Sequence, residues 1–342
     1  MVGFAFLGPA LGRHEGWVTT QGEVLAGLFA AEGHPTFVSS TELSPLRRAV
    51  DHARDLCRWR SLIDVAVVSV FSGRALALAD ESLSLARVLR IPAIAWLHGG
   101  DLPSLGQRHP RWVGRVLRSA DAVVAPTAYL GRWAEAFVDD VRVIPNVMDL
   151  SDYEFRVRSP LRPRLLWMRT FHELYDPASA VRVLASLRDS GVDAHLTMAG
   201  QDKGLLDETR ALAGQLQVEE FVRFPGFVSG AQKAALFRDH DIFLNTNVVD
   251  NAPVTVLEAA ASGLVVVSTN VGGVPDLLAD GEAAVLVPAR DSEAMAMAVR
   301  GVMDQPDHGS GLAVGARLVA EGSAWTSVRD QWLGVADRIR RT

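Results

Sequence analysis

The sequence predicts an α/β protein with two parallel sheets in series, and three observations lead to this prediction. Short apolar runs alternate with amphipathic segments along the whole chain, a pattern typical of parallel sheets covered by helices. The 342 residues exceed one comfortable hydrophobic core, which favours two domains. A turn-rich, charged stretch over residues 148–164 interrupts the alternation, and we interpret it as a linker.

The expected strands are six apolar runs in each half of the chain, because parallel strands buried on both faces are continuously apolar. In the first half they cover residues 3–7, 36–39, 64–70, 93–97, 122–125 and 141–144. In the second half they cover residues 164–168, 194–199, 221–224, 242–245, 264–268 and 284–287. Helices are expected between them, for example over 21–31 and 80–89, and a last helix is expected over 325–341.

Composition and charge exclude several classes of protein. Hydrophobic residues make up 49% of the chain and charged residues 22%, which indicates a globular protein. The net charge of −6 argues against a nucleic-acid partner, which would need a basic surplus. Cys57 is the one cysteine, so an internal disulfide and a cysteine metal cluster are excluded. Because no apolar run of about 18 residues occurs, we expect a cytoplasmic protein.

The most informative segment runs from Asp250 to Glu258 and places two acids eight residues apart. Asp250 and Asn251 are turn formers, and Pro253 suits the first position of a helix, where its missing N–H is no loss. Glu258, further along that helix, offers a carboxylate to a pair of vicinal hydroxyls. The spacing therefore predicts a turn followed by a helix, with one acid before the helix and one within it.

The start of this helix and a glycine loop further along are suited to a phosphate. N–H groups near Val254 and Thr255 are expected at the positive end of the helix dipole. An apolar strand follows, and Gly272-Gly273 then leads into a second expected helix. Two helix starts and two close approaches permitted by glycine, all facing one crevice, indicate a site for a nucleotide sugar.

This segment resembles the donor-binding signature of the family 4 retaining glycosyltransferases, which have the GT-B fold. That signature is Glu-x7-Glu, a helix of small residues, an apolar strand and Gly-Gly-x-Pro-Glu; here Asp250 and Asp276 replace the first and last glutamates. The resemblance implies two Rossmann-like domains with a cleft between them. Residues 1–155 would bind the acceptor, residues 156–322 would bind the nucleotide-sugar donor, and residues 323–342 would form a helix that crosses back onto the first domain.

The resemblance also implies roles for residues of this chain. Glu258 would hold the ribose hydroxyls, and Asp250 with the nearby amides would hold hydroxyls of the transferred sugar. Arg169, the helix amides and the glycine loop would stabilise the departing diphosphate. The implied catalytic residues are His98, Arg169, Asp250 and Glu258. The implied donor-binding residues are Gly16, Arg169, Gly200, Phe227, Asp250, Asn251, Ala252, Pro253, Val254, Thr255, Glu258, Gly272 and Gly273.

Arg169 directly follows an expected strand. In the family this arginine and a lysine five residues later bind the diphosphate, but the lysine position is Leu174 here. Some relatives instead have Arg-x-Phe followed by Tyr and Pro, and this chain fits that variant. Two negative charges need a fixed cation or several amides once water is excluded. His172 and Tyr175 are candidates to replace part of the lost lysine.

Other candidates lie in loops that follow expected strands. Gly16 matches one glycine of the loop with which the family approaches the donor diphosphate, although Trp17 stands where the second glycine is expected. Gly200 and Phe227 lie in loops that resemble those lining the nucleotide base. Because the backbone of such loops makes the contacts, their side chains do not identify the base.

The acceptor-side candidates are His98 and Asp101. His98 precedes two glycines at the end of an expected strand, and it resembles the family histidine that lies close to the transferred sugar. Asp101 belongs to the same loop and is a candidate to bind an acceptor hydroxyl. A side chain in such a loop can point into a ligand site.

Arg108, Arg111, Arg115 and Arg118 recur at spacings of three and four, which predicts an arginine stripe along one amphipathic helix. A solvated helix face explains this pattern, and contact with an anionic membrane surface or an acidic acceptor is the alternative. A peripheral location at the inner face of the membrane therefore stays open beside the cytoplasmic one.

The sequence thus predicts a retaining glycosyltransferase that moves a hexose-type sugar from a nucleotide diphosphate sugar to a glycan, lipid or small-molecule acceptor. A UDP-sugar is favoured over a GDP-sugar. No cofactor is expected, because GT-B enzymes of this kind need no metal. Two alternatives stay open: a sugar-nucleotide epimerase of the same fold, and a non-catalytic nucleotide-sugar binding protein.

Overall fold

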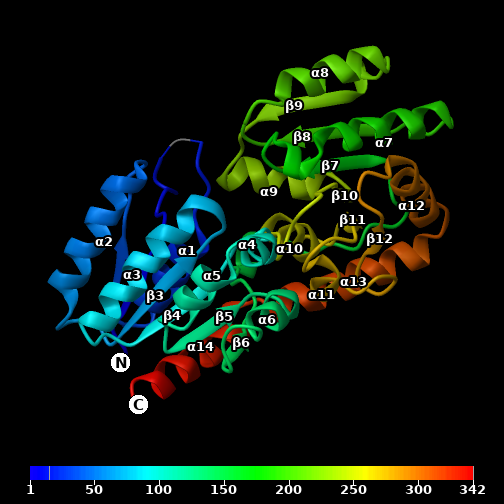
Figure 1. Cartoon of the computed structure of the whole chain (residues 1–342). Helices are drawn as coiled ribbons and strands as arrows, with labels where there is room; N and C mark the ends of the chain where they lie inside the picture. Colours follow the sequence, from blue (N-terminus) through cyan, green and yellow to red (C-terminus); the bar gives the residue numbers. More distant parts are fainter. Residues whose placement is uncertain (15, 342) are drawn as a thin grey trace. The chain divides into compact units, whose positions relative to one another are not determined.

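Parallel strands with helices between them form two separate sheets, as the alternation of apolar runs predicts. The computed structural model describes residues 1–14 and 16–341. The chain divides into unit 1, which comprises residues 1–148 and the chain from Ser323 onward, and unit 2, which comprises residues 149–322. Each unit holds one six-stranded parallel sheet with helices packed against it (Figure 1). Every expected strand is present, with ends shifted by at most two residues.

Unit 1 contains a sheet with the strand order β2-β1-β3-β4-β5-β6, in which all neighbours are parallel. Its strands are β1 (Phe4–Leu7), β2 (Thr36–Ser39), β3 (Val65–Val70), β4 (Ala93–Leu97), β5 (Ala122–Ala125) and β6 (Val141–Val143). Its helices are α1 (Gln21–Ala31), α2 (Pro45–Trp59), α3 (Leu76–Val88), α4 (Leu102–Arg108), α5 (Pro110–Leu117), α6 (Ala128–Ala134), α14 (Trp325–Ile339) and the 3-10 turn η1 (Gly73–Ala75).

Unit 2 contains a sheet with the strand order β12-β11-β10-β7-β8-β9, again parallel throughout. Its strands are β7 (Arg164–Met168), β8 (His195–Ala199), β9 (Val222–Gly226), β10 (Ile242–Asn245), β11 (Val265–Thr269) and β12 (Val285–Val287). Its helices are α7 (Pro177–Asp189), α8 (Leu206–Gln215), α9 (Gly230–Asp239), α10 (Val254–Ala261), α11 (Val274–Leu277), α12 (Ser292–Asp304) and α13 (Pro306–Gly322), with 3-10 turns η2 (Leu150–Asp152), η3 (Glu173–Tyr175) and η4 (Glu219–Phe221).

The sheet of unit 1 is buried on both faces because its strands are apolar at successive positions. Phe4 and Phe6 of β1 face one core, whereas Ala5 and Leu7 face the other. The C-terminal helix α14 packs on the first of these faces (Figure 1). Its Trp332 meets Trp96 of β4 edge to face, with ring centroids 4.9 Å apart. A helix from the chain end therefore completes the core of unit 1.

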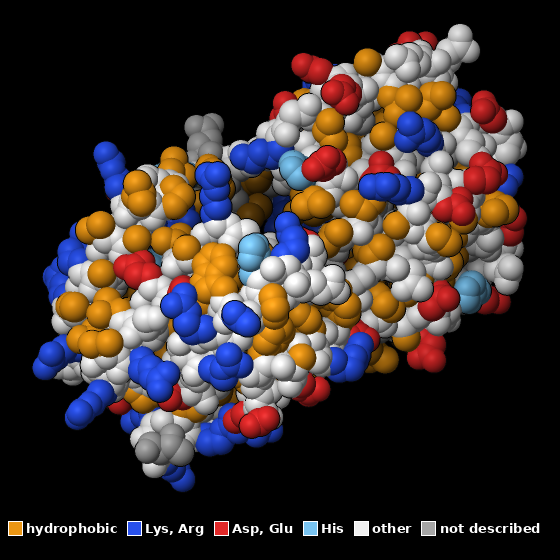
Figure 2. Space-filling view, in the orientation of Figure 1, with side chains coloured by type: hydrophobic (Ala, Val, Ile, Leu, Met, Phe, Trp, Pro, Cys, Tyr) orange, Lys and Arg blue, Asp and Glu red, His pale blue; other side chains and the backbone are white. Residues whose placement is uncertain are grey.

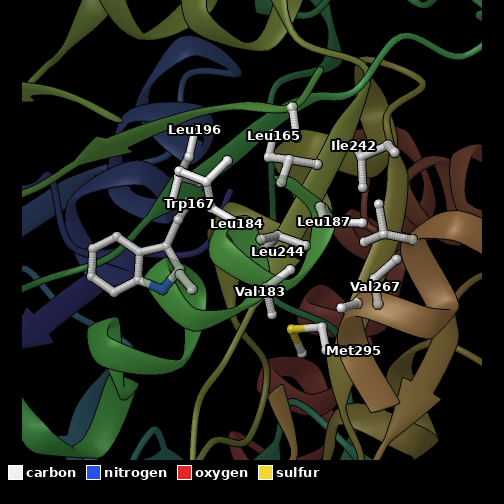
Figure 3. Close-up of a cluster of buried hydrophobic side chains, with 14 of the residues drawn as sticks. Leu165, Trp167, Val183, Leu184, Leu187, Leu196, Ile242, Leu244, Val267 and Met295 are labelled. Carbon is white, nitrogen blue, oxygen red and sulfur yellow. The ribbon is translucent and has the colours of Figure 1, made fainter. Parts of the chain in front are cut away.

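The core of unit 2 includes Trp167 of β7, which lies at one side of a group of aliphatic side chains (Figure 3). Leucine, isoleucine and valine side chains of β7, β8, β10 and β11 meet α7 in this core. The indole N–H of Trp167 donates to Thr246 Oγ1 at 2.8 Å, so its one polar group is paired inside the apolar cluster. Packing and pairing together fix the carboxyl end of β7.

The boundary between the units lies earlier than the sequence indicates. We expected it after residue 155, whereas unit 2 begins at Asp149. Two side chains of the intervening segment explain the difference. Tyr153 donates a hydrogen bond to Glu258 at 2.7 Å, and the ring of Phe155 lies beneath the Arg317 guanidinium, 5.4 Å from ring centroid to Cζ. The first part of the predicted linker is therefore anchored to unit 2.

Candidate active site

The strand order of unit 2 reverses between β7 and β10, which lie side by side in the sheet although β8 and β9 lie between them in the sequence. Such a reversal leaves a crevice at the carboxyl ends of the strands, where ligands of α/β proteins bind. Arg169 directly follows β7, and Asn247 and Asp250 lie in the loop that follows β10. The sheet topology therefore brings together residues that are about 80 positions apart in the sequence.

Arg169 is held by three neighbours. Its Nη2 forms an ion pair with Asp250 Oδ2, and its Nε donates to Asn247 Oδ1 at 3.5 Å. The guanidinium also lies over the ring of Tyr175, with Cζ 4.5 Å from the ring centroid. The two charged side chains are only 15% and 13% exposed. A partly desolvated arginine in a fixed orientation is suited to bind a phosphate.

Asp250 is the centre of a second set of contacts. Its Oδ2 also accepts from Asn247 Nδ2, and its Oδ1 accepts from the backbone N–H of Asn251 at 2.8 Å. The carbonyl of Asp250 accepts from the N–H of Gly273 at 3.3 Å. The first acid of the predicted pair thus joins the arginine to the glycine loop.

Two of the predicted glycines are required for close approach. Gly200 has φ 155° and Gly272 has φ 53°, backbone conformations that favour glycine. A Cβ on Gly200 would overlap the carbonyl oxygen of Arg169, and a Cβ on Gly272 would overlap the carbonyl oxygen of Asp250. Both glycines therefore serve the packing of the loops around the arginine and the first acid.

The helix α10 begins one residue later than expected. Pro253 is its N-cap and Val254 and Thr255 are its first helical residues, so the expectation that Pro253 opens the helix is wrong. The reason is that the ψ angle of Pro253 is 113°, an extended value. The N–H groups of Val254 and Thr255 have no acceptor within the helix, because they belong to its first turn. Thr255 Oγ1 is buried and has no hydrogen-bond partner among the residues described.

Glu258 lies within α10 and is buried. Its Oε1 accepts from the Tyr153 hydroxyl at 2.7 Å and from Lys233 Nζ at 2.5 Å. Burial, and next the charge of Glu258, raise the pKa of the Tyr153 phenol, so this hydroxyl keeps its proton and donates. The second acid of the predicted pair therefore has a cation and a neutral donor of its own.

The second helix start contributes less than expected. α11 after the Gly272-Gly273 loop has only four residues, and one turn of helix sums few peptide dipoles. Pro275 at its start and the extended backbone of Leu278 at its end keep it short. The electrostatic contribution of this loop is therefore limited to its local amides.

The position of the missing lysine carries no cation. Leu174 is 38% exposed, and its carbonyl accepts from the N–H of Val248 at 2.9 Å. His172 caps the turn η3, because its Nδ1 accepts from the N–H of Leu174 at 3.2 Å. Tyr175 instead supports Arg169 through its ring. Neither side chain supplies the second positive charge.

The remaining loop candidates of unit 2 lie beside β8 and β9. The N–H of Gly200 donates to the carbonyl of Gly226 at 2.9 Å, which holds the two loops side by side. Phe227 follows β9 and is half-buried. Gly226 is itself the last residue of β9, so that strand reaches further than the apolar run predicts.

The acceptor-side candidates belong to unit 1. His98 follows β4, and its ring lies between those of Phe71 and Trp96, with centroids 4.9 and 4.3 Å away. The residue keeps some exposure, but its Nε2 is buried and has no hydrogen-bond partner among the residues described. Burial lowers the pKa of His98 to about 3, so the imidazole is neutral near pH 7 and can donate or accept one hydrogen bond. Asp101 forms an ion pair with Arg108 at 3.5 Å.

Gly16 also belongs to unit 1 and lies in the turn between β1 and α1, with φ 80°. This left-handed backbone conformation favours glycine. The N–H of Trp17 donates to the carbonyl of His14 at 3.1 Å, which closes the turn.

The predicted arginine stripe along one helix is wrong. The helix breaks at His109, and Pro110 starts α5, so Arg108 ends α4 and Arg118 follows α5. Proline cannot continue a helix, because it lacks the N–H and its ring meets the preceding turn. Arg115 is paired with Asp80 of α3. On the face shown in Figure 2, basic side chains are dispersed among apolar and neutral ones over the helices of unit 1.

No group of three or more His, Cys, Asp or Glu side chains suited to a metal ion occurs within residues 1–14 and 16–341. The chain does contain one Asp-x-Asp sequence, Asp239-His240-Asp241. Asp241 is 1% exposed and bound by Arg162 at 2.9 Å and Arg158 at 3.5 Å, at the amino end of β10. This acid therefore holds the second part of the linker in place. In the part of the chain that the structure covers, no helix is long and apolar enough to cross a membrane.

Three residues that contact the predicted site were not identified from the sequence: Asn247, Tyr153 and Lys233. Asn247 follows β10 and bonds both Arg169 and Asp250. Lys233 is one of only two lysines in the chain, and that rarity is the one signal that could have drawn attention to it. Tyr153 gave no signal, because its partner lies 105 residues away.

Two family models match the chain. The model described as glycosyl transferases group 1 matches residues 162–305, within unit 2. The model described as glycosyltransferase family 4 matches residues 27–152, almost wholly within unit 1. Together the two matches cover most of both units.

Curated relatives are similar at low identity. Glycogen synthase of Mycobacterium tuberculosis is 26% identical over 249 residues, which is 67% of this chain and 58% of that protein. Phosphatidyl-myo-inositol mannosyltransferase of Mycolicibacterium smegmatis is 26% identical over 302 residues, which is 84% of this chain and 74% of that protein. The match thus spans less than two thirds of the first of these relatives.

Solved structures share the architecture. Sucrose-phosphate synthase of Thermosynechococcus elongatus superposes with a TM-score of 0.80 at 14% identity and covers 99% of each chain. HepE of Anabaena, solved in complex with UDP and glucose, superposes with a TM-score of 0.78 at 15% identity over 99% of this chain and 100% of that one. The predicted fold class, two Rossmann-like parallel sheets of the GT-B type with a C-terminal helix returning to the first, is confirmed.

Proposed function

The chain belongs to the group 1, family 4 type of glycosyltransferases, and on this premise we propose that it transfers a hexose-type sugar from a nucleotide diphosphate sugar, with retention of configuration. A UDP-sugar is the favoured donor, and a glycan, a lipid or a small molecule is the acceptor. One observation carries the proposal: Arg169 and Asp250 meet at the carboxyl ends of β7 and β10, where the strand order of unit 2 reverses.

Each residue of this cluster has a role in the proposal. Arg169, the first amides of α10 and the amides of the Gly272-Gly273 loop stabilise the charge that develops on the leaving diphosphate. Asp250 accepts hydrogen bonds from hydroxyls of the transferred sugar. Glu258 accepts hydrogen bonds from the ribose. The HepE structure contains UDP and glucose, and its likeness to this chain supports a sugar nucleotide as ligand.

The ion pair between Arg169 and Asp250 sets the order of events in the proposal. Asp250 forms an ion pair with the arginine. A diphosphate carries more charge than one carboxylate and offers more acceptor oxygens, so it competes for the guanidinium. Asp250 keeps its bonds to Asn247 and to the N–H of Asn251, and it becomes available to a sugar hydroxyl.

In this proposal the configuration is retained because the acceptor attacks the anomeric carbon from the face that the diphosphate leaves. In the proposed reaction the bond from the anomeric carbon to the diphosphate oxygen breaks, and the acceptor oxygen bonds to that carbon on the same face. The departing phosphate takes the acceptor proton. His98, neutral near pH 7 because burial lowers its pKa to about 3, binds a sugar hydroxyl in this scheme and does not serve as the base. Product analysis by NMR, which distinguishes the two anomers, tests the retention.

The binding-protein alternative is kept because Leu174 provides no second cation for the diphosphate. Incubation with radiolabelled UDP- and GDP-sugars, with and without a cell extract, separates the candidates. Slow hydrolysis of the donor together with label in an acceptor supports the transferase. Binding with neither reaction supports the binding protein, and interconversion of the sugar nucleotide supports an epimerase. Turnover that survives EDTA supports the proposed independence from metal, and loss restored by Mg²⁺ contradicts it.

A further inference from the structure

Glu258 is bonded asymmetrically. Two donors reach the same oxygen, Oε1: the Tyr153 hydroxyl at 2.7 Å and Lys233 Nζ at 2.5 Å. Within residues 1–14 and 16–341, no side chain or backbone N–H donates to the other oxygen, Oε2. The terminal torsion of a glutamate is broad when nothing holds it. Two donors on one oxygen restrict that torsion and leave the second oxygen in one orientation.

The two donors come from different parts of unit 2. Tyr153 follows the turn η2, and its ring meets Phe237 of α9 edge to face, with centroids 6.0 Å apart. Lys233 lies one turn earlier on the same helix α9, and its side chain is 30% exposed. Glu258 belongs to α10. The carboxylate is therefore held between two helices and the segment that enters unit 2.

The donors also differ in chemistry. The pKa of the Tyr153 phenol is raised by burial and by the charge of Glu258, so Tyr153 is a neutral donor at physiological pH. Lys233 is a cation, and it offsets the charge of a carboxylate that is buried in α10. The ion pair with Lys233 therefore compensates for taking the carboxylate out of water.

We propose that Tyr153 and Lys233 are positioning residues that present Oε2 of Glu258 to the vicinal hydroxyls of the donor ribose. The selectivity of this protein for ribonucleotides over deoxyribonucleotides then depends on all three side chains. The inference rests on the proposed function, because it assumes that Glu258 binds the nucleoside part of a sugar nucleotide. It goes further because it assigns a positioning role to two residues outside the Asp250–Glu258 segment.

Calorimetry with paired nucleotides tests the proposal. The probes are UDP, GDP and their 2′,3′-dideoxy counterparts, titrated into the full chain. We expect the wild type to bind the preferred ribonucleotide at least about tenfold more tightly than its dideoxy form, since a hydrogen bond to a charged acceptor contributes that much. Tyr153→Phe and Lys233→Met should each reduce this ratio to about threefold or less, with little change in affinity for the dideoxy nucleotide.

Matched variants separate positioning from general damage. Tyr129→Phe removes a hydroxyl in unit 1, and Arg238→Met removes an exposed cation from the same helix as Lys233; both should keep the wild-type ratio. Lys233→Arg should restore most of it. A helix α10 that unfolds in a variant would weaken both nucleotides equally and would be visible by circular dichroism.

The possible results are distinct. If Glu258→Gln abolishes the ribose preference while Tyr153→Phe and Lys233→Met retain it, the positioning role is wrong and Glu258 acts alone. If the wild type binds the ribo and dideoxy forms equally, the assigned contact of Glu258 is wrong as well. If the wild type binds neither UDP nor GDP, the proposed function fails before the positioning role is tested, and both proposals are withdrawn.

Discussion

The polar groups around Trp167 in unit 2 and those around Trp96 in unit 1 differ in their hydrogen bonding. In unit 2, Trp167 donates to Thr246, and the two buried acids Asp241 and Glu258 each have a cationic partner. In unit 1, the indole nitrogens of Trp96 and Trp332 and the Nε2 of His98 are buried with no hydrogen-bond partner among the residues described. These polar groups of unit 2 are therefore paired with other protein groups, whereas this part of unit 1 is held together by aromatic packing.

The two units also differ in charge: basic side chains outnumber acidic ones in unit 1, and acidic side chains outnumber basic ones in unit 2. By the boundaries of the structure, unit 1 carries 19 basic and 16 acidic side chains, and unit 2 carries 15 and 24. An acidic unit that binds an anionic diphosphate must concentrate its few cations where the ligand lies. Arg169 and Lys233, both paired with acids of the predicted site, are cations of that kind. Charge placement, and not net charge, therefore prepares unit 2 for its proposed ligand.

The largest expected effect comes from the cation of the unit 2 site. Arg169→Ala should lower turnover by about 10²- to 10³-fold, because a preorganised donor to the leaving group typically contributes about 2.7–4 kcal/mol to catalysis. Steady-state kinetics with the preferred sugar nucleotide measures the loss. Arg238→Ala, which removes an exposed arginine of α9, is the control. Wild-type turnover in the Arg169 variant would remove the arginine from the site.

A pair of tryptophan substitutions tests the contrast between paired and unpaired groups directly. Trp167→Phe leaves Thr246 Oγ1 without its buried donor, whereas Trp332→Phe removes an N–H that has no hydrogen-bond partner within residues 1–14 and 16–341. The same volume is lost at both positions. We expect Trp167→Phe to lower the free energy of local unfolding by about 1–3 kcal/mol more than Trp332→Phe does. Hydrogen exchange followed by mass spectrometry resolves the two units, and equal losses would abolish the contrast.

The pH dependence of unit 1 sharpens the contrast further. The pKa of His98 is about 3 in the folded protein, against 6.5 for the free side chain. Between these values the unfolded chain binds more protons, so the free energy of unfolding falls as pH drops below 6.5. Over the first pH unit below 6.5, His98 should lower the free energy of unfolding by about 1 kcal/mol. Denaturant titrations of wild type and His98→Asn should show that the variant loses less.

The control for this titration is His308→Asn, because His308 is exposed on α13. That variant measures the effect of the same substitution at a histidine outside the sheet of unit 1. If His98→Asn reproduced the wild-type pH dependence, the imidazole would titrate normally in the folded protein. His98 would then be exposed to solvent and would not be the neutral hydroxyl-binding group that the proposed function assigns to it.

The smallest expected effect concerns the dispersed arginines of unit 1. Arg111→Gln should leave sedimentation with phosphatidylglycerol vesicles unchanged, because the break at His109 separates Arg108 from the other three arginines and Arg115 is already paired with Asp80. Arg90→Gln, which lies outside this region, is the matched control. A clear loss of vesicle binding in the Arg111 variant alone would show that this surface contacts anionic lipid after all.

The site could be predicted only where its residues lie close together in the sequence. The segment from Asp250 to Glu258 and the Gly272-Gly273 loop form one strand–helix–strand unit, so spacing and residue type were sufficient to identify it. Arg169, 81 positions before Asp250, is the exception: its place directly after an expected strand and the resemblance to the family identified it. Asn247, Tyr153 and Lys233 could not be found, because an asparagine, a tyrosine or a lysine at those positions has no distinctive spacing. Their contacts depend on which strands and helices become neighbours.

The sequence by itself determined the twelve strands, the two-sheet architecture and the positions of the two acids, because apolar periodicity and turn residues act over a few neighbouring positions. Only the tertiary structure decided the partners of those acids, the break at Pro110 and the anchoring of Tyr153 to unit 2. The physical reason is that hydrogen bonds and ion pairs are short-ranged, so they form only after the order of strands in each sheet has placed distant residues in contact.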